Sequence, residues 1–107
     1  MMELSEETWE LVQKLFAPEQ HQTAARLLEE ECGNNLPFLA ELDPYRLERL
    51  RFAALKLSGG RLSDLQTAVA VARQDWRDLL VAAGFANSLD AHKQWAAEAI
   101  TSASRQK

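Results

Sequence analysis

Hydrophobic residues recur along this chain at intervals of three and four positions, which is the spacing of one face of an α-helix. The clearest stretch is 62–85, LSDLQTAVAVARQDWRDLLVAAGF, where the pattern predicts two consecutive helices. No segment combines sustained apolar–polar alternation with enrichment in β-branched residues, so no strand is predicted. We therefore expect an all-α fold, a compact single-domain bundle of five or six short helices over residues 1–107, with a frayed tail at 101–107.

Capping signals place the first two helices. Ser5 is predicted as an N-cap, because the acidic residues Glu6 and Glu7 follow it and favour the positive end of a helix dipole. Pro18 suits the first turn of a second helix, and Gly33 suits its end. The apolar stripe of the first helix is predicted to be Trp9, Val12, Leu15 and Phe16.

The middle of the chain has equally clear signals. The pair Asp43-Pro44 predicts the start of a third helix, and the glycine pair at 59–60 predicts its end. Ser63, with a glutamine three residues later, has the capping-box pattern at the start of a fourth helix.

The last two helices follow from similar signals. Asp75 is predicted to cap a fifth helix that ends at Gly84, with Phe85 folding back on Leu80 in a Schellman closure. A final helix is expected to start at residue 87 or 88.

Composition favours a cytoplasmic protein. Cys32 is the only cysteine, which excludes an internal disulfide and favours a reducing compartment. The acidic N-terminus has no following apolar segment and does not resemble a signal peptide. The longest nearly apolar run, 79–86, is too short to span a bilayer, so no membrane contact is expected.

Charge is unevenly distributed along the chain. The net charge is −4, with −8 in residues 1–43, +4 in residues 44–61 and zero in residues 62–107. An acidic protein repels phosphate backbones, so nucleic acid is disfavoured as a partner.

A DNA-binding regulator acting through 63–85 remains an alternative, because this stretch has a helix–break–helix pattern. Its second helix offers Arg77 for reading a base edge, beside Asp78, which repels phosphate. Such a function requires the basic residues to share one uninterrupted face: Arg46, Arg49, Arg51, Lys56 and Arg61.

Catalytic chemistry would need Cys32 close to a histidine base. His21 lies eleven residues before Cys32 on one predicted helix, which separates the two by about 16 Å. Only His92, through tertiary packing, leaves an enzyme with a Cys/His site open as an alternative. One cysteine and two distant histidines do not supply a zinc site, and Glu29–Glu31 point to different sides of a helix. We expect that the protein is not an enzyme and that it binds no cofactor and no metal.

Several larger side chains are interpreted as parts of the core. His92 lies within the apolar stripe of the last helix and is expected to be buried, with a ring N–H donated to a backbone carbonyl and a lowered pKa. Trp9 and Trp76 are predicted to anchor the core, and Trp95 to lie at its edge.

The third helix, PYRLERLRFAALKLS, has apolar residues on two opposite sides. Such a helix is either central in its own domain or exposes one side to a partner. Aromatic residues and arginine are enriched at interfaces, so we predict a surface for a protein partner or a homodimer on one side. Its residues are Tyr45, Arg49, Phe52, Leu55 and Lys56.

Three segments, FAALKLSGG, DWRDLLVAAGF and HKQW, form a pattern within residues 44–95 that resembles a group of small bacterial proteins of unknown function. The resemblance implies a bacterial source and a helical fold, and it supplies no site. The sequence therefore predicts a small non-enzymatic interaction module: an adaptor, a regulator or an immunity-type partner.

Overall fold

The computed structural model describes residues 4–34, 44–86 and 90–105, and every regular element in these ranges is helical. The Cα atoms span 40 × 29 × 22 Å, and the prediction of a single-domain all-α fold is confirmed. The elements are α1 (Glu6–Leu15), the 3₁₀ turn η1 (Pro18–Gln20), α2 (His21–Arg26), η2 (Leu27–Asn34), α3 (Pro44–Ser58), α4 (Leu62–Gln74), α5 (Trp76–Ala83) and α6 (Ala91–Arg105).

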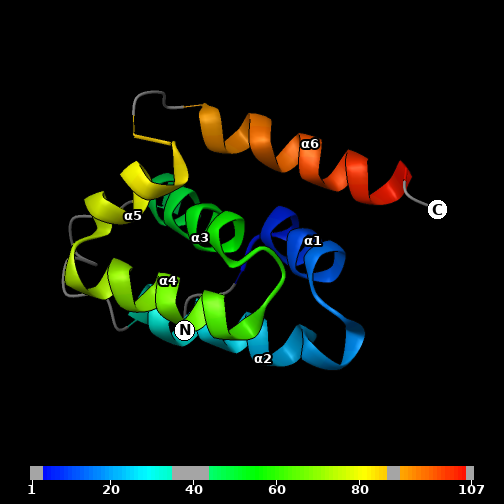
Figure 1. Ribbon diagram of the computed structural model, residues 1–107, viewed down its shortest axis with the longest axis horizontal. Helices are drawn as coiled ribbons and strands as arrows, with labels where there is room; N and C mark the ends of the chain where they lie inside the picture. The colour runs from blue at the N-terminus through cyan, green and yellow to red at the C-terminus, as the bar shows by residue number, and fades with distance from the viewer. Residues whose placement is uncertain (1–3, 35–43, 87–89, 106–107) are drawn as a thin grey trace.

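Helix α3 lies at the centre of the bundle and contacts α1, η2, α4, α5 and α6 (Figure 1). Its two apolar sides are therefore both used inside the chain, and six of its apolar side chains are buried: Leu47, Leu50, Phe52, Ala53, Ala54 and Leu55. The interpretation of this helix as central is confirmed.

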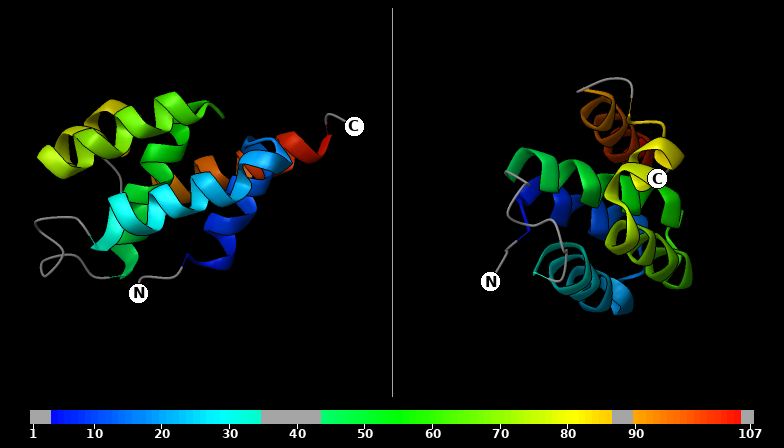
Figure 2. Two further views of the ribbon diagram at one scale, coloured as in Figure 1. Left: turned by 90° about the horizontal axis from the view of Figure 1, so that it is seen from below. Right: turned by 90° about the vertical axis from the view of Figure 1, so that its left-hand side faces the viewer.

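The helices form three layers. Helix α6 lies on one outer side, α3 and α1 occupy the middle, and α4 packs beside η2 on the opposite side (Figure 1 and Figure 2). Helix α5 contacts both α3 and α4 at one end of the bundle. Two different layers therefore cover the two sides of α3.

Three predicted helix ends are confirmed. The hydroxyl of Ser5 accepts a hydrogen bond from the backbone N–H of Thr8 at 3.1 Å, and the carboxylate of Asp75 accepts one from Arg77 N–H at 3.0 Å. Gly84 has a left-handed φ of 80°, and the Phe85 N–H donates to the Leu80 carbonyl at 2.9 Å. The Gly84 N–H also donates to the Val81 carbonyl at 3.1 Å, which completes the Schellman motif.

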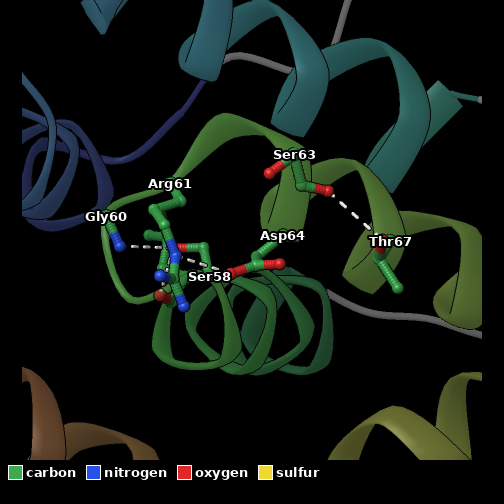
Figure 3. Close-up of polar contacts among 7 residues, drawn as sticks. Ser58, Gly60, Arg61, Ser63, Asp64 and Thr67 are labelled. Carbon is green, nitrogen blue, oxygen red and sulfur yellow. Dashed lines mark hydrogen bonds and ion pairs between the residues drawn. The ribbon is translucent and has the colours of Figure 1, made fainter.

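The capping-box prediction for α4 is wrong. The helix begins at Leu62, one residue before Ser63, and Arg61 occupies the N-cap without a side-chain cap. Ser63 instead lies in the first turn, where its carbonyl accepts from the Thr67 hydroxyl at 3.2 Å (Figure 3). An ion pair from Arg61 to Asp64, at 2.8 Å, spans the same turn. The helix starts earlier because Leu62 packs against the core, and this burial outweighs the cap.

Other boundaries differ less from the prediction. Pro18 and Pro44 open their helices, whereas helical backbone angles already break at Cys32, one residue before Gly33. Asp43 and the predicted start of the last helix at 87–88 lie outside the described residues. Helix α6 extends into the tail as far as Arg105, and the fraying of that tail stays a prediction.

Trp9 was predicted as a core anchor, and this is wrong, because the residue is 37% exposed. The buried face of α1 is rotated toward Thr8, Leu11 and Val12. Within the described ranges, every helix is too short or too polar to cross a membrane.

Candidate functional site

The predicted partner surface on α3 is covered by the chain itself. Phe52 and Leu55 are both fully buried, so the prediction that they meet a partner is wrong. The rings of His92 and Trp95, both on α6, lie 5.5 and 6.3 Å from the Phe52 ring. Tyr45 is half-buried, and its ring lies 5.2 Å from that of His92. The sequence identified an apolar face correctly, but α6 is what covers it.

The two basic residues of the predicted surface hold the C-terminus of α5. Lys56 Nζ donates to the Ala83 carbonyl at 2.8 Å and lies 5.1 Å from the centre of the Phe85 ring. A guanidinium nitrogen of Arg49 donates to the Phe85 carbonyl. Helix C-termini carry partial negative charge, so both cations stabilise the closure of α5. Their contacts join α3 to α5 within the chain.

His92 is fully buried, as predicted, and its neighbours are aromatic rings. The rings of Tyr45, Phe52 and Phe85 lie 5.2, 5.5 and 6.2 Å from its imidazole. The predicted hydrogen bond from a His92 ring N–H to a backbone carbonyl is wrong. Within the part of the chain that the structure describes, neither ring nitrogen has a hydrogen-bond partner. Burial, followed by the positive charge of Arg49, lowers the pKa of His92, and this predicted direction is confirmed.

Cys32 and His92, the two residues considered as a catalytic pair, are not within hydrogen-bonding distance. Neither ring nitrogen of His92 makes a hydrogen bond to any described residue, which places the Cys32 thiol beyond its reach. Burial raises the pKa of Cys32 to about 12, so the thiol is protonated at neutral pH and is a poor nucleophile. His21 lies elsewhere, with Nε2 2.9 Å from the Phe16 carbonyl and its ring 6.3 Å from that of Trp9 in a T-shaped arrangement.

The basic residues do not form the single face that the DNA-binding alternative requires. Arg51 is buried, and its Nε donates to the Cys32 carbonyl at 3.1 Å. Lys56 and Arg49 are directed to the end of α5. Arg61, after the C-terminal end of α3, pairs with Asp64 in the first turn of α4. The positive charge of 44–61 is therefore dispersed through the structure.

The acidic residues Glu29–Glu31 also fail to converge. Glu31 forms an ion pair with Arg73 of α4 at 2.9 Å. A hollow of about 110 Å³ lies beside them, lined by Thr23, Arg26, Leu27, Glu30 and Glu31. Across the described ranges, no group of three or more His, Cys, Asp and Glu residues is arranged to hold a metal ion.

Among the described residues, the most exposed large apolar side chain lies on α5. Val81 is 66% exposed, and it is one helical turn from Arg77, which is also exposed. The Arg77 guanidinium lies 5.5 Å from the centre of the half-buried Trp76 ring. We call the exposed residues Arg77, Asp78, Val81 and Ala82, together with the half-buried Trp76, the α5 face. Sequence reasoning missed this face.

Comparison of the chain with protein-family models, with curated proteins and with solved structures finds no match. The resemblance to a group of small bacterial proteins stays a prediction.

Proposed function

We propose that this chain is a small non-enzymatic protein-interaction module, an adaptor, regulator or immunity-type partner, and that it docks through the α5 face. The observation that carries the proposal is the 66% exposure of Val81 beside Arg77 and Trp76. The other polar clusters considered above serve the fold: Asp75 caps α5, and Lys56 holds its opposite end.

The composition of this region supports docking. Between residues 62 and 86 the sequence contains no lysine and no glutamate, although the whole chain is rich in glutamate. Protein interfaces are depleted in lysine and glutamate, and also in aspartate and alanine, and they are enriched in tryptophan and arginine, which are frequent hot-spot residues. The α5 face contains Trp76 and Arg77 and lacks lysine and glutamate, whereas Asp78 and Ala82 are of the depleted types.

The chemistry of the face specifies its occupant. Val81 and Ala82 require apolar side chains opposite them, Arg77 requires an acceptor such as a carboxylate, and the exposed Asp78 requires a donor. We propose as the partner a different protein with an apolar depression bordered by an acidic and a basic residue, and a second copy of this chain is an outcome that the test distinguishes. Cys32 is a free buried thiol, which favours the cytoplasm as the site of action.

Site-specific photo-crosslinking tests the proposal. A photoreactive amino acid at Ala82 should give one crosslinked product in cells, and Val81→Lys should abolish it, because a charge then replaces the apolar contact. Lysine is compatible with the C-terminal turn of α5, so the fold should be retained. The matched controls are the same probe at Gln66 and the variant Thr67→Lys, both on the exposed side of α4.

Three outcomes separate the possibilities. A heterologous product lost only in Val81→Lys supports the α5 face. A product containing only this chain, with dimers in sedimentation, replaces the foreign partner with a second copy. Equal crosslinking from Ala82 and Gln66, or a product insensitive to Val81→Lys, contradicts the proposal.

A further inference from the structure

Helix α6 forms an outer layer of the bundle and packs on α1 and α3 (Figure 2). Most of its contact with the rest of the chain is with α1, and its first turns meet α3 and Phe85 through His92 and Trp95. The Trp95 ring lies 6.3 Å from Phe52 and 6.1 Å from Phe85, and His92 lies between the same two rings and Tyr45. The first turns of α6 are thus held by a seat of aromatic rings.

The seat suits an uncharged imidazole and not a charged one. Both ring nitrogens of His92 are buried and lack a hydrogen-bond partner among the described residues. A protonated imidazole has two N–H donors, and burying such a cation without an acceptor is costly. Packing alone does not explain a buried imidazole without hydrogen bonds, because an apolar side chain would fill the seat without the cost of burying unpaired nitrogens.

Charged groups around the seat increase this cost. From α3, Arg49 opposes a positive charge on His92 and Glu48 favours one. Lys93 of α6 opposes it and Asp90, just before α6, favours it, each with a smaller effect than burial.

Two further charged groups lie near these neighbours. Lys56 of α3 lies over the Phe85 ring on the α5 side of the seat. Glu7 of α1 interacts with Glu48 and Lys93, the groups that border the seat on that side. None of the described contacts provides His92 with a carboxylate as a direct partner.

We propose that protonation of His92 releases α6 from α3 and Phe85, so that α6 is a pH-sensitive strap across the bundle. The inference goes beyond the proposed function and does not depend on the α5 face. Release exposes Phe52 and Phe85, which are buried when α6 is docked. The layer of α4 and η2 lies on the other side of α3 and keeps its own contacts.

The direction of the effect follows from linkage. Burial lowers the pKa of His92 in the docked state, whereas an undocked histidine titrates near its usual value of about 6.5. The undocked state therefore binds more protons between these two values, and acid favours release. Above about pH 6.5 the docking equilibrium does not depend on the protonation of His92, and below it the equilibrium shifts toward release by up to about tenfold for each pH unit.

Native-state hydrogen exchange tests the proposal on the intact chain. Exchange of α6 amides in the wild type, corrected for intrinsic rates, should accelerate as the pH falls from 7.5 to 5, by up to about tenfold per unit below about 6.5. Amides of α4 should show no such change. Two apolar variants, His92→Phe and His92→Leu, should keep α6 protected at both pH values, and either one suffices if the other fails to fold.

The control is His21→Gln, which removes the other histidine and should leave the acid response of α6 intact. An NMR titration of the wild type gives an independent measurement, with a folded pKa for His92 below about 6.5 expected. The proposal is overturned by a pKa at or above that value, by an equal acid response in the His92 variants, or by parallel opening of α4 and α6.

Discussion

The two sides of α3 each bury a polar side chain, and they satisfy it differently. On the side of η2, the Arg51 guanidinium reaches the Cys32 carbonyl at 3.1 Å, so a permanent charge is held by a fixed acceptor. On the side of α6, His92 is surrounded by rings and has no acceptor among the described residues. Arginine keeps its proton in either setting, whereas histidine can lose its proton and remain buried as a neutral ring. The contact that buries Arg51 is therefore permanent, whereas the packing of His92 depends on pH.

The largest effect should come from the η2 side. Arg51→Ala removes a charge-assisted hydrogen bond, leaves the Cys32 carbonyl without this donor and empties the volume of a buried side chain, so we expect a loss of about 3 kcal/mol in the free energy of unfolding. Urea denaturation at pH 7 measures it. Arg46→Ala is the matched control on the exposed side of the same helix and should cost less than about 0.5 kcal/mol. Equal losses would mean that burial of Arg51 contributes nothing.

The opposite side should respond with the opposite sign. His92→Leu removes two buried unpaired nitrogens, so we expect a gain of about 1 kcal/mol in the free energy of unfolding at pH 7.5. The gain should increase at pH 5.5, because the folded pKa of His92 is lowered and only the wild type has the stability loss that this histidine causes below about pH 6.5. Urea denaturation at both pH values measures the difference. A variant that is less stable than the wild type at both would mean that the imidazole contributes favourable contacts.

Helix α5 contacts α3 and α4 at one end of the bundle, and the chain caps both of its ends. Asp75→Ala removes the acceptor of the Arg77 N–H and should cost about 1 kcal/mol. Asp75→Asn retains an accepting oxygen and should cost much less. Thermal melts of the two variants test this, and equal destabilisation would mean that Asp75 acts through its charge and not as a cap.

The predictability of each feature depended on how far apart its residues lie in the chain. The caps at Ser5 and Asp75 and the closure at Phe85 involve residues at most five positions apart, so local rules predicted them. The two-sided pattern of α3 also predicted a central or an interface helix. The covering of Phe52 by His92 depends on residues forty positions apart, and no local pattern specifies such a contact.

The same distinction explains the two remaining errors in the sites. The absence of an acceptor for His92 depends on which carbonyls the seat offers, which is a property of the tertiary structure. The α5 face rests on Val81, whose exposure follows from the placement of α5 against α3 and α4. Local sequence patterns therefore predicted the helices and most of their ends, whereas the sites could be identified only from the packing of the helices.

The smallest effect is expected at Ser63, and it sharpens the contrast between α4 and α5. A cap at Ser63 would make Ser63→Ala as costly as Asp75→Ala, about 1 kcal/mol. In the structure Ser63 lies inside the first turn, and it is the Ser63 backbone carbonyl that accepts from Thr67. We therefore expect Ser63→Ala to change the free energy of unfolding by less than about 0.5 kcal/mol, since alanine also has the higher helix propensity. Thermal melts of the two alanine variants side by side make the comparison. A loss at Ser63 equal to that at Asp75 would show that α4 begins at Ser63 in solution, and the start at Leu62 would then be wrong.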